Sequence, residues 1–168
     1  SRQLVSGEID IDTAYEKFQN LKESDYPSWL KNVGLVIMCG CYAALYGATL
    51  LEMFVAGIAA IVLPFIYKLD AKLGLGMFIT NLISIIPMVI IICYLQETIF
   101  PSIHIGIPII GAIMPAVPGT AITNAIRDTL RGDYNSGTAR AVEAAVTALS
   151  ISIAVVIGLL IGGGVNPI

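Results

Sequence analysis

Five apolar segments dominate this sequence, and nearly all are long enough to cross a lipid bilayer. They run over residues 30–51, 53–67, 73–95, 103–126 and 139–162. A helix crosses about 30 Å of hydrocarbon with about 20 apolar residues, and only the second segment falls short of that length. Charged residues make up 12% of the chain, whereas soluble domains contain about 25%. We therefore predict an all-α integral membrane protein with about five transmembrane helices, the second of them short.

Basic residues lie on one side of the predicted spans. All nine lysines and arginines fall in the N-terminal region, in the loop 67–72 or in the loop 127–140. The alternate segments, 47–52, 96–104 and the C-terminal tail, contain no basic residue. Because cytoplasmic loops are enriched in Lys and Arg, we expect the N-terminus in the cytoplasm and the C-terminus outside. The net charge of −3 and the lack of a basic stripe argue against a nucleic-acid partner.

Residues 1–27 are polar and have a helical repeat. Apolar side chains recur there every three or four residues, at Ile11, Ala14, Tyr15, Phe18 and Leu21. This spacing predicts an amphipathic helix in the cytoplasm or at the membrane surface. We interpret it as the end of a soluble domain that mostly precedes this sequence, and residues 28–168 as a five-helix transmembrane domain.

The fourth apolar segment contains two helix-breaking prolines. Pro115 and Pro118 each lack a backbone N–H and clash with the preceding turn, so the helix should break there. At about 1.5 Å per residue from His104, the break is expected about 16 Å deep, near the bilayer midplane. A half-helix that starts at Gly119 would present free N–H groups and a partial positive charge, which suits a carboxylate or another small anion.

Polar residues follow the break at helical spacing, namely Thr120, Asn124, Arg127 and Asp128. Positions three and four residues apart share a helix face, so this pattern favours a binding site. A proline-kinked helix that only packs against its neighbours remains an alternative for the same residues.

Further polar positions have two interpretations each. Glu143 lies just inside the fifth apolar segment, where an ionisable side chain is costly and is a functional candidate. Alternatively, Glu143 forms an ion pair with Arg140, three residues before it. Asn81 either lines a polar cavity or hydrogen-bonds to a neighbouring helix. Gly132 and Asp133 are typical of a helix end.

No residue set typical of catalysis or metal binding accompanies these positions. The three cysteines, Cys39, Cys41 and Cys93, lie inside apolar runs, and the single histidine does not join them. We therefore expect no enzymatic activity, no cofactor and no bound metal.

A long ordered string of residues runs through the fourth and fifth segments. It reads Gly-Ala-Ile-Met-Pro-x-x-Pro-Gly at 111–119, Thr-Asn-Ala-Ile-Arg-Asp at 123–128, Gly-Asp-Tyr at 132–134, Ser136-Gly137 and Arg140-x-x-Glu143-Ala144. This string resembles the bacterial threonine/serine exporter family, in its N-terminal-type membrane domain. A weaker similarity of helix pattern extends the resemblance over residues 26–162.

The resemblance implies proton-driven export of small hydrophilic metabolites, either threonine and serine or dicarboxylates such as succinate, across the inner membrane of a bacterial cell. It also implies a second membrane domain, which is fused in some members and a separate small membrane subunit in others. This sequence has no second half, so it resembles the split type, whose partner is that second subunit. Glycine- and alanine-rich helix faces also permit a homo-oligomer.

Two other functions remain as alternatives to the exporter, namely a non-transporting scaffold subunit and a passive channel.

By resemblance, the family's polar motif falls on Pro115, Pro118, Gly119, Asn124, Arg127, Asp128, Gly132, Asp133 and Glu143. Our own hypothesis assigns the substrate carboxylate to the amides of Gly119 and Thr120 and to Asn124. It assigns a second anionic group, or an ion pair with Asp128, to Arg127. Proton coupling is assigned to Asp128 or Glu143, and pathway lining to Asn81, Asp133 and Arg140.

Overall fold

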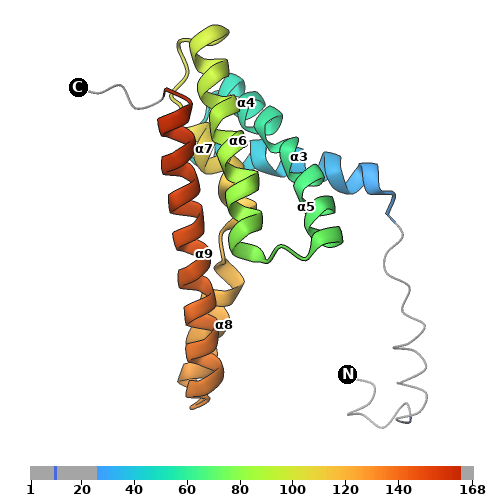
Figure 1. The fold of residues 1–168 in the computed structure, drawn as a ribbon, viewed down its shortest axis with the longest axis vertical. Coiled ribbons are helices and arrows are strands. Elements are labelled where there is room, and N and C mark those ends of the chain that lie inside the picture. The colour runs from blue at the N-terminus through green and yellow to red at the C-terminus, as the bar shows by residue number, and fades with distance from the viewer. Residues whose placement is uncertain (1–9, 11–25, 164–168) are drawn as a thin grey trace. The chain divides into compact units, whose positions relative to one another are not determined.

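The computed structural model describes residue 10 and residues 26–163, and every regular element in that part of the chain is a helix (Figure 1). The chain divides into two compact units, Ser1–Lys31 and Asn32–Ile168. The amphipathic helix predicted within residues 1–27 falls almost entirely outside the described residues. In chain order the elements are α3 (Ser28–Leu45), α4 (Leu50–Ala60), α5 (Val62–Leu73), α6 (Met77–Thr98), α7 (Gly106–Ile113), the 3-10 turn η1 (Met114–Ala116), α8 (Gly119–Leu130) and α9 (Tyr134–Ile161).

Four helical stretches are long and apolar enough to cross a membrane: α3, the pair α4–α5, α6 and α9. The bent pair of α7–η1 and α8 adds a fifth if it counts as one span. Large apolar side chains point outward from these helices, among them Leu45, Leu50 and Phe54, which are each 70% exposed or more. Such a surface suits lipid and not water. The predicted all-α membrane fold with about five spans is confirmed.

The second span is longer than the sequence indicated. Together α4 and α5 cover 24 residues, Leu50–Leu73, or about 36 Å. The helix begins early because Thr49 and Glu52 form a capping box, in which the Glu52 carboxylate accepts from the Thr49 amide at 2.8 Å. Glu52 therefore lies inside α4, and the prediction of a short second span that excluded it is wrong. Pro64 has no N–H for the Ala60 carbonyl, which accounts for the one-residue break at Ile61.

Helix α6 is the centre of the packing and contacts α4, α5, α7 and α9. Its fully buried side chains Ile85, Met88 and Ile92 belong to one apolar cluster with residues of the neighbouring helices. Between α6 and α9 the backbones approach closely, because a Cβ at Gly158 would lie only 2.6 Å from the Cβ of Val89. Small residues of this kind let membrane helices gain van der Waals contact, which is the main attraction between them in lipid.

Helix α9 has two partners along its length. It contains 28 residues, or about 42 Å, which exceeds the hydrocarbon thickness by about 12 Å. Its first half packs beside α8 and its second half beside α6 (Figure 1). The partner of α9 changes from α8 to α6 near Thr147. The Thr147 hydroxyl lies 3.1 Å from the Sδ atom of Met77, which is the first residue of α6. Helix α9 begins at Tyr134, five residues earlier than the predicted start at 139. Helix α8 and the beginning of α9 therefore form a helical hairpin, which lies beyond the N-terminal end of α6 at Met77 (Figure 1).

Candidate functional site

The predicted break in the fourth span is present at the predicted residues. Pro115 lies in the turn η1, and Pro118 is the residue directly before α8, which begins at Gly119. Val117 between the prolines is extended, with φ −67° and ψ 126°. The two helical parts are bent by 55°. Because neither proline can donate a backbone hydrogen bond, the helix cannot continue through this stretch.

The break lies near one end of α6 (Figure 1). Figure 1 shows α8 lying beyond the end of α6 that begins at Met77, beside the first half of α9. The start of α8 is therefore near the level at which α6 begins, and not halfway along α6. The 99–105 connection turns back from the end of α6 before α7 starts (Figure 1), and the depth of the break in the bilayer stays a prediction.

The amides at the start of α8 are only partly free. The Gly119 N–H already donates to the Val117 carbonyl at 2.8 Å, so this geometry does not leave it for a substrate carboxylate, contrary to our hypothesis. Thr120 is exposed, and Asn124 is half-buried one turn later. The distance from Gly119 to Arg127 along the helix is about 12 Å. The predicted site residues of α8 therefore divide into two groups, one at each end of the helix.

The second group forms a charged cluster between α8 and α9. A carboxylate oxygen of Asp128 lies 3.0 Å from Arg140 Nε, and the other lies 3.9 Å from Arg127 Nε. The Asp128 side chain is 16% exposed, whereas the two arginine side chains are about half exposed. Arg140 thus pairs with Asp128 across the hairpin, and not with Glu143 as in one of the two interpretations given for Glu143.

A glycine makes that cross-helix pair possible. Gly137 is buried on α9, and a Cβ at that position would collide with the Thr129 hydroxyl and lie 3.2 Å from the Ala125 carbonyl oxygen, both on α8. Only a residue without a side chain lets the two backbones approach so closely. The close approach brings Asp128 within reach of Arg140, because Arg140 is one turn after Gly137 on the same helix.

The remaining predicted residues lie apart from the cluster. Asp133 is exposed and caps α9, because its carboxylate accepts from the Ser136 amide at 3.1 Å. Hydrogen bonds from the Ser136 side chain and backbone lower the pKa of Asp133. Glu143 is exposed on α9, with no ion pair in the part of the chain that the structure describes. Asn81 is buried and donates from Nδ2 to the Ser150 hydroxyl at 2.8 Å. Of its two interpretations, the structure thus shows the hydrogen bond to a neighbouring helix.

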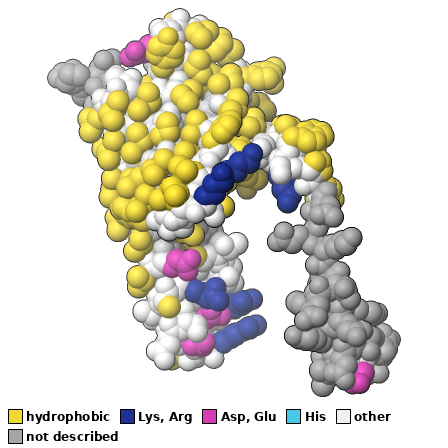
Figure 2. All heavy atoms as spheres, turned by 45° about the vertical axis from the view of Figure 1, so that its right-hand side comes forward, with side chains coloured by type: hydrophobic (Ala, Val, Ile, Leu, Met, Phe, Trp, Pro, Cys, Tyr) yellow, Lys and Arg dark blue, Asp and Glu magenta, His cyan; other side chains and the backbone are white. Residues whose placement is uncertain are grey.

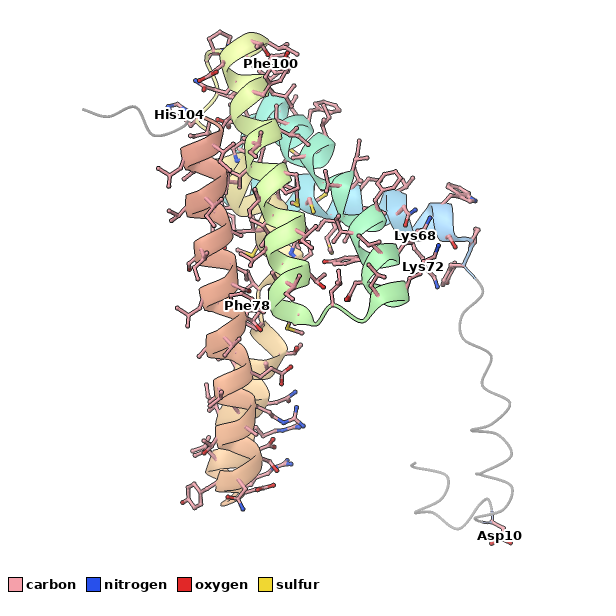
Figure 3. All side chains as sticks on the ribbon, viewed as in Figure 1. Asp10, Lys68, Lys72, Phe78, Phe100 and His104 are labelled. Atoms are coloured by element: carbon pink, nitrogen blue, oxygen red, sulfur yellow. The ribbon has the colours of Figure 1, made fainter. Side chains whose placement is uncertain are left out.

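One buried charged residue escaped the sequence analysis. Glu52 is 2% exposed, and besides the Thr49 amide and hydroxyl its carboxylate accepts from the His104 backbone N–H at 3.0 Å. The His104 imidazole lies 3.7 Å away and is 87% exposed (Figure 3). These hydrogen bonds of Glu52 join the start of α4 to the connection that precedes α7. The spacing Thr49-x-x-Glu52 is typical of a capping box, so the sequence could have predicted the bonds to Thr49 but not the bond to His104.

The chemistry of the arginine–aspartate cluster is suited to small charged molecules. Two guanidinium groups bind carboxylates through geometrically matched hydrogen bonds, and Asp128 supplies a negative charge between them. Such a site offers both signs of charge within one small space, as a zwitterion requires. The exposed arginines keep the cluster open to water-borne molecules.

The long apolar helices and the apolar outer surface define a multi-pass membrane protein. The chain matches the family model ThrE, threonine/serine exporter, over residues 1–162, and it belongs to that family. The resemblance found in the sequence is therefore confirmed. No curated protein and no solved structure matches the chain.

Proposed function

We propose that this chain is the membrane subunit of a proton-driven exporter of small hydrophilic metabolites, threonine and serine or dicarboxylates such as succinate, in the inner membrane of a bacterial cell. Membership of the threonine/serine exporter family supports the transport of small polar molecules. The observation that carries the proposal is the Asp128 carboxylate placed between Arg127 and Arg140. The cluster is the cytoplasmic binding site in this proposal.

Substrate binding exchanges one ion pair for another. The carboxylate of threonine or serine displaces Asp128 from Arg140 and takes its hydrogen bonds. The substrate ammonium then pairs with the released Asp128 carboxylate, so no charge in the site is left alone. A dicarboxylate would instead occupy both arginines and leave Asp128 without a partner.

Proton coupling is assigned to Asp128 in preference to Glu143. Asp128 is largely buried and paired, so its protonation breaks the pair with Arg140 and frees that guanidinium group for the substrate. Glu143 is exposed and unpaired among the described residues, so its protonation changes little around it. A carboxylate that alternates between a paired and a protonated state is a general means of linking proton movement to a conformational change.

The complete exporter contains a second small membrane subunit of the same family in this proposal. Residues 28–168 form the transmembrane domain, with the N-terminus inside and the C-terminus outside. The confinement of all nine basic residues to one side of the predicted spans supports this orientation.

Transport by vesicles that contain both subunits tests the proposal. We expect labelled threonine, serine or succinate to move against its gradient when a proton gradient is imposed. Asp128→Asn should lower that rate at least tenfold, whereas Glu143→Gln should retain both the rate and its pH dependence. Flux that ignores the proton gradient identifies a passive channel, and full transport by the Asp128→Asn variant would overturn the role of Asp128. An Asn124→Cys variant that stays inert to a soluble maleimide would favour a scaffold subunit.

A further inference from the structure

An apolar groove runs between α3 and the α4–α5 span. One part of it, with a volume of about 320 Å3, lies beside Cys41. The other part, of about 380 Å3, reaches Asn32 and Lys68. The two parts are continuous because they share the lining residues Val36, Ile37 and Ile61. Ile37 and Ile61 are 59% and 48% exposed, so the groove opens on the outer surface of the helices, where a membrane protein meets lipid.

The groove ends at a positive charge. Lys68 lines that end and lies one turn before Lys72 on α5 (Figure 3). Among the described residues Lys68 forms no ion pair. The nearest carboxylate along the helix, Asp70, instead accepts from the Leu75 amide at 3.0 Å. The groove thus combines apolar walls with an unpaired cation at one end.

The length of the groove and the charge at its end suit one acyl chain with an anionic headgroup. From Asn32 to Cys41 the groove follows α3 for about 14 Å. That length matches half of the hydrocarbon thickness of about 30 Å, which is the depth that one lipid leaflet covers.

We propose that the groove binds an anionic phospholipid, with one acyl chain along Val36 and Ile61 and the phosphate on Lys68. Asn32 supplies a second polar contact at the headgroup. Basic positions between membrane helices bind anionic headgroups by charge, and each Lys contributes binding free energy that a zwitterionic headgroup does not gain. The site is separate from the cluster around Asp128, and the lipid would fix the angle between α3 and α5.

Alkylation of Cys41 tests the proposal, because Cys41 is exposed in the groove whereas Cys39 and Cys93 are buried. The purified full chain is treated with N-ethylmaleimide in detergent that contains either phosphatidylglycerol or phosphatidylcholine at the same mole fraction. We expect phosphatidylglycerol to slow the modification of Cys41 about fivefold more than phosphatidylcholine does, which corresponds to about 1 kcal/mol for one lysine. Lys68→Gln should bring the two rates together.

Lys72→Gln is the matched control, because it removes the same charge from the same helix but does not line the groove. Equal rates in the two lipids, or equal effects of the two lysine variants, would overturn the proposal. Protection of Cys41 by a co-purified protein in the absence of lipid would overturn it too. Native mass spectrometry gives a second readout: Ile37→Trp, which fills the groove, should lose the bound phosphatidylglycerol that the unmodified chain and the Lys72→Gln variant retain.

Discussion

Asp128 shows how a residue's role depends on the partners that surround it. Its carboxylate lies between Arg127 and Arg140, and both guanidinium groups are about half exposed. Exposed ion pairs contribute little to stability because water screens them and the side chains lose freedom on pairing. The cluster is therefore better suited to exchanging partners with a substrate than to holding the hairpin together.

A first prediction separates these two roles. Asp128→Asn should lower the free energy of unfolding in detergent by no more than about 1 kcal/mol, while it removes most of the transport. Arg131→Gln, an exposed charge on the same hairpin that makes no ion pair among the described residues, is the control for both measurements. A much larger loss of stability in the Asp128→Asn variant would show that the pair is structural.

A second residue-scale prediction concerns pH. Because hydrogen bonds from Ser136 lower the pKa of Asp133, the ionised carboxylate stabilises the start of α9. This stabilisation is complete above the ordinary pKa of an aspartate and is lost as the pH falls through the lowered pKa. Hydrogen-exchange protection of the Ser136 amide should therefore decrease on acidification, and in Asp133→Asn it should stay constant. Unchanged protection in the native chain would contradict the capping role.

The contact between helices α8 and α9 depends on one missing side chain. A Cβ at Gly137 would collide with Thr129 on α8. We predict that Gly137→Val forces the two helices apart, with a cost of about 1–3 kcal/mol as in overpacked cores, and that transport is lost because Arg140 no longer reaches Asp128. Thr138→Val, at an exposed neighbouring position, should leave thermal unfolding and transport unchanged. If Gly137→Val kept normal stability and transport, the close approach of α8 and α9 at Gly137 would not be what brings Asp128 and Arg140 together.

The contact between α6 and α9 carries a hydrogen bond inside the apolar region. Asn81 donates to Ser150, whose own hydroxyl donates to the Thr147 carbonyl at 2.7 Å. Interhelical hydrogen bonds in membranes contribute about 0.6 kcal/mol on average. A double-mutant cycle of Asn81→Val and Ser150→Ala, measured by unfolding, should return a coupling of about that size. Additive effects would show that the two residues act independently.

At the scale of the whole molecule, charge is distributed unevenly between the two ends of the spans. Within Asn32–Gly163 the basic residues lie at the end of α5 and on the α8–α9 hairpin, whereas Glu52 and Glu97 lie at the opposite ends of α4 and α6. Figure 2 shows basic side chains at the lower edge of the main apolar surface and below it, where acidic side chains lie among them. This distribution is typical of a protein oriented by its cytoplasmic lysines and arginines.

Labelling of intact cells tests that orientation. In a Cys41→Ser background, Glu97→Cys should react with a membrane-impermeant maleimide added outside, and Arg131→Cys should react only after the membrane is opened. Both positions are exposed, so a difference in reactivity reports the side of the membrane and not burial. The opposite labelling pattern would reverse the assigned topology and move the proposed binding cluster to the outer face.

The sequence by itself determined the all-helical membrane fold, the break at Pro115 to Pro118 and the family. Apolar length and a missing backbone N–H act locally, so they can be read from neighbouring residues. Only the tertiary structure decided that Arg140 pairs with Asp128, that Asn81 pairs with Ser150, and that α8 lies beyond α6. Those outcomes depend on which helices approach each other, and the approach is set by packing at positions such as Gly137, far along the chain from the residues it brings together.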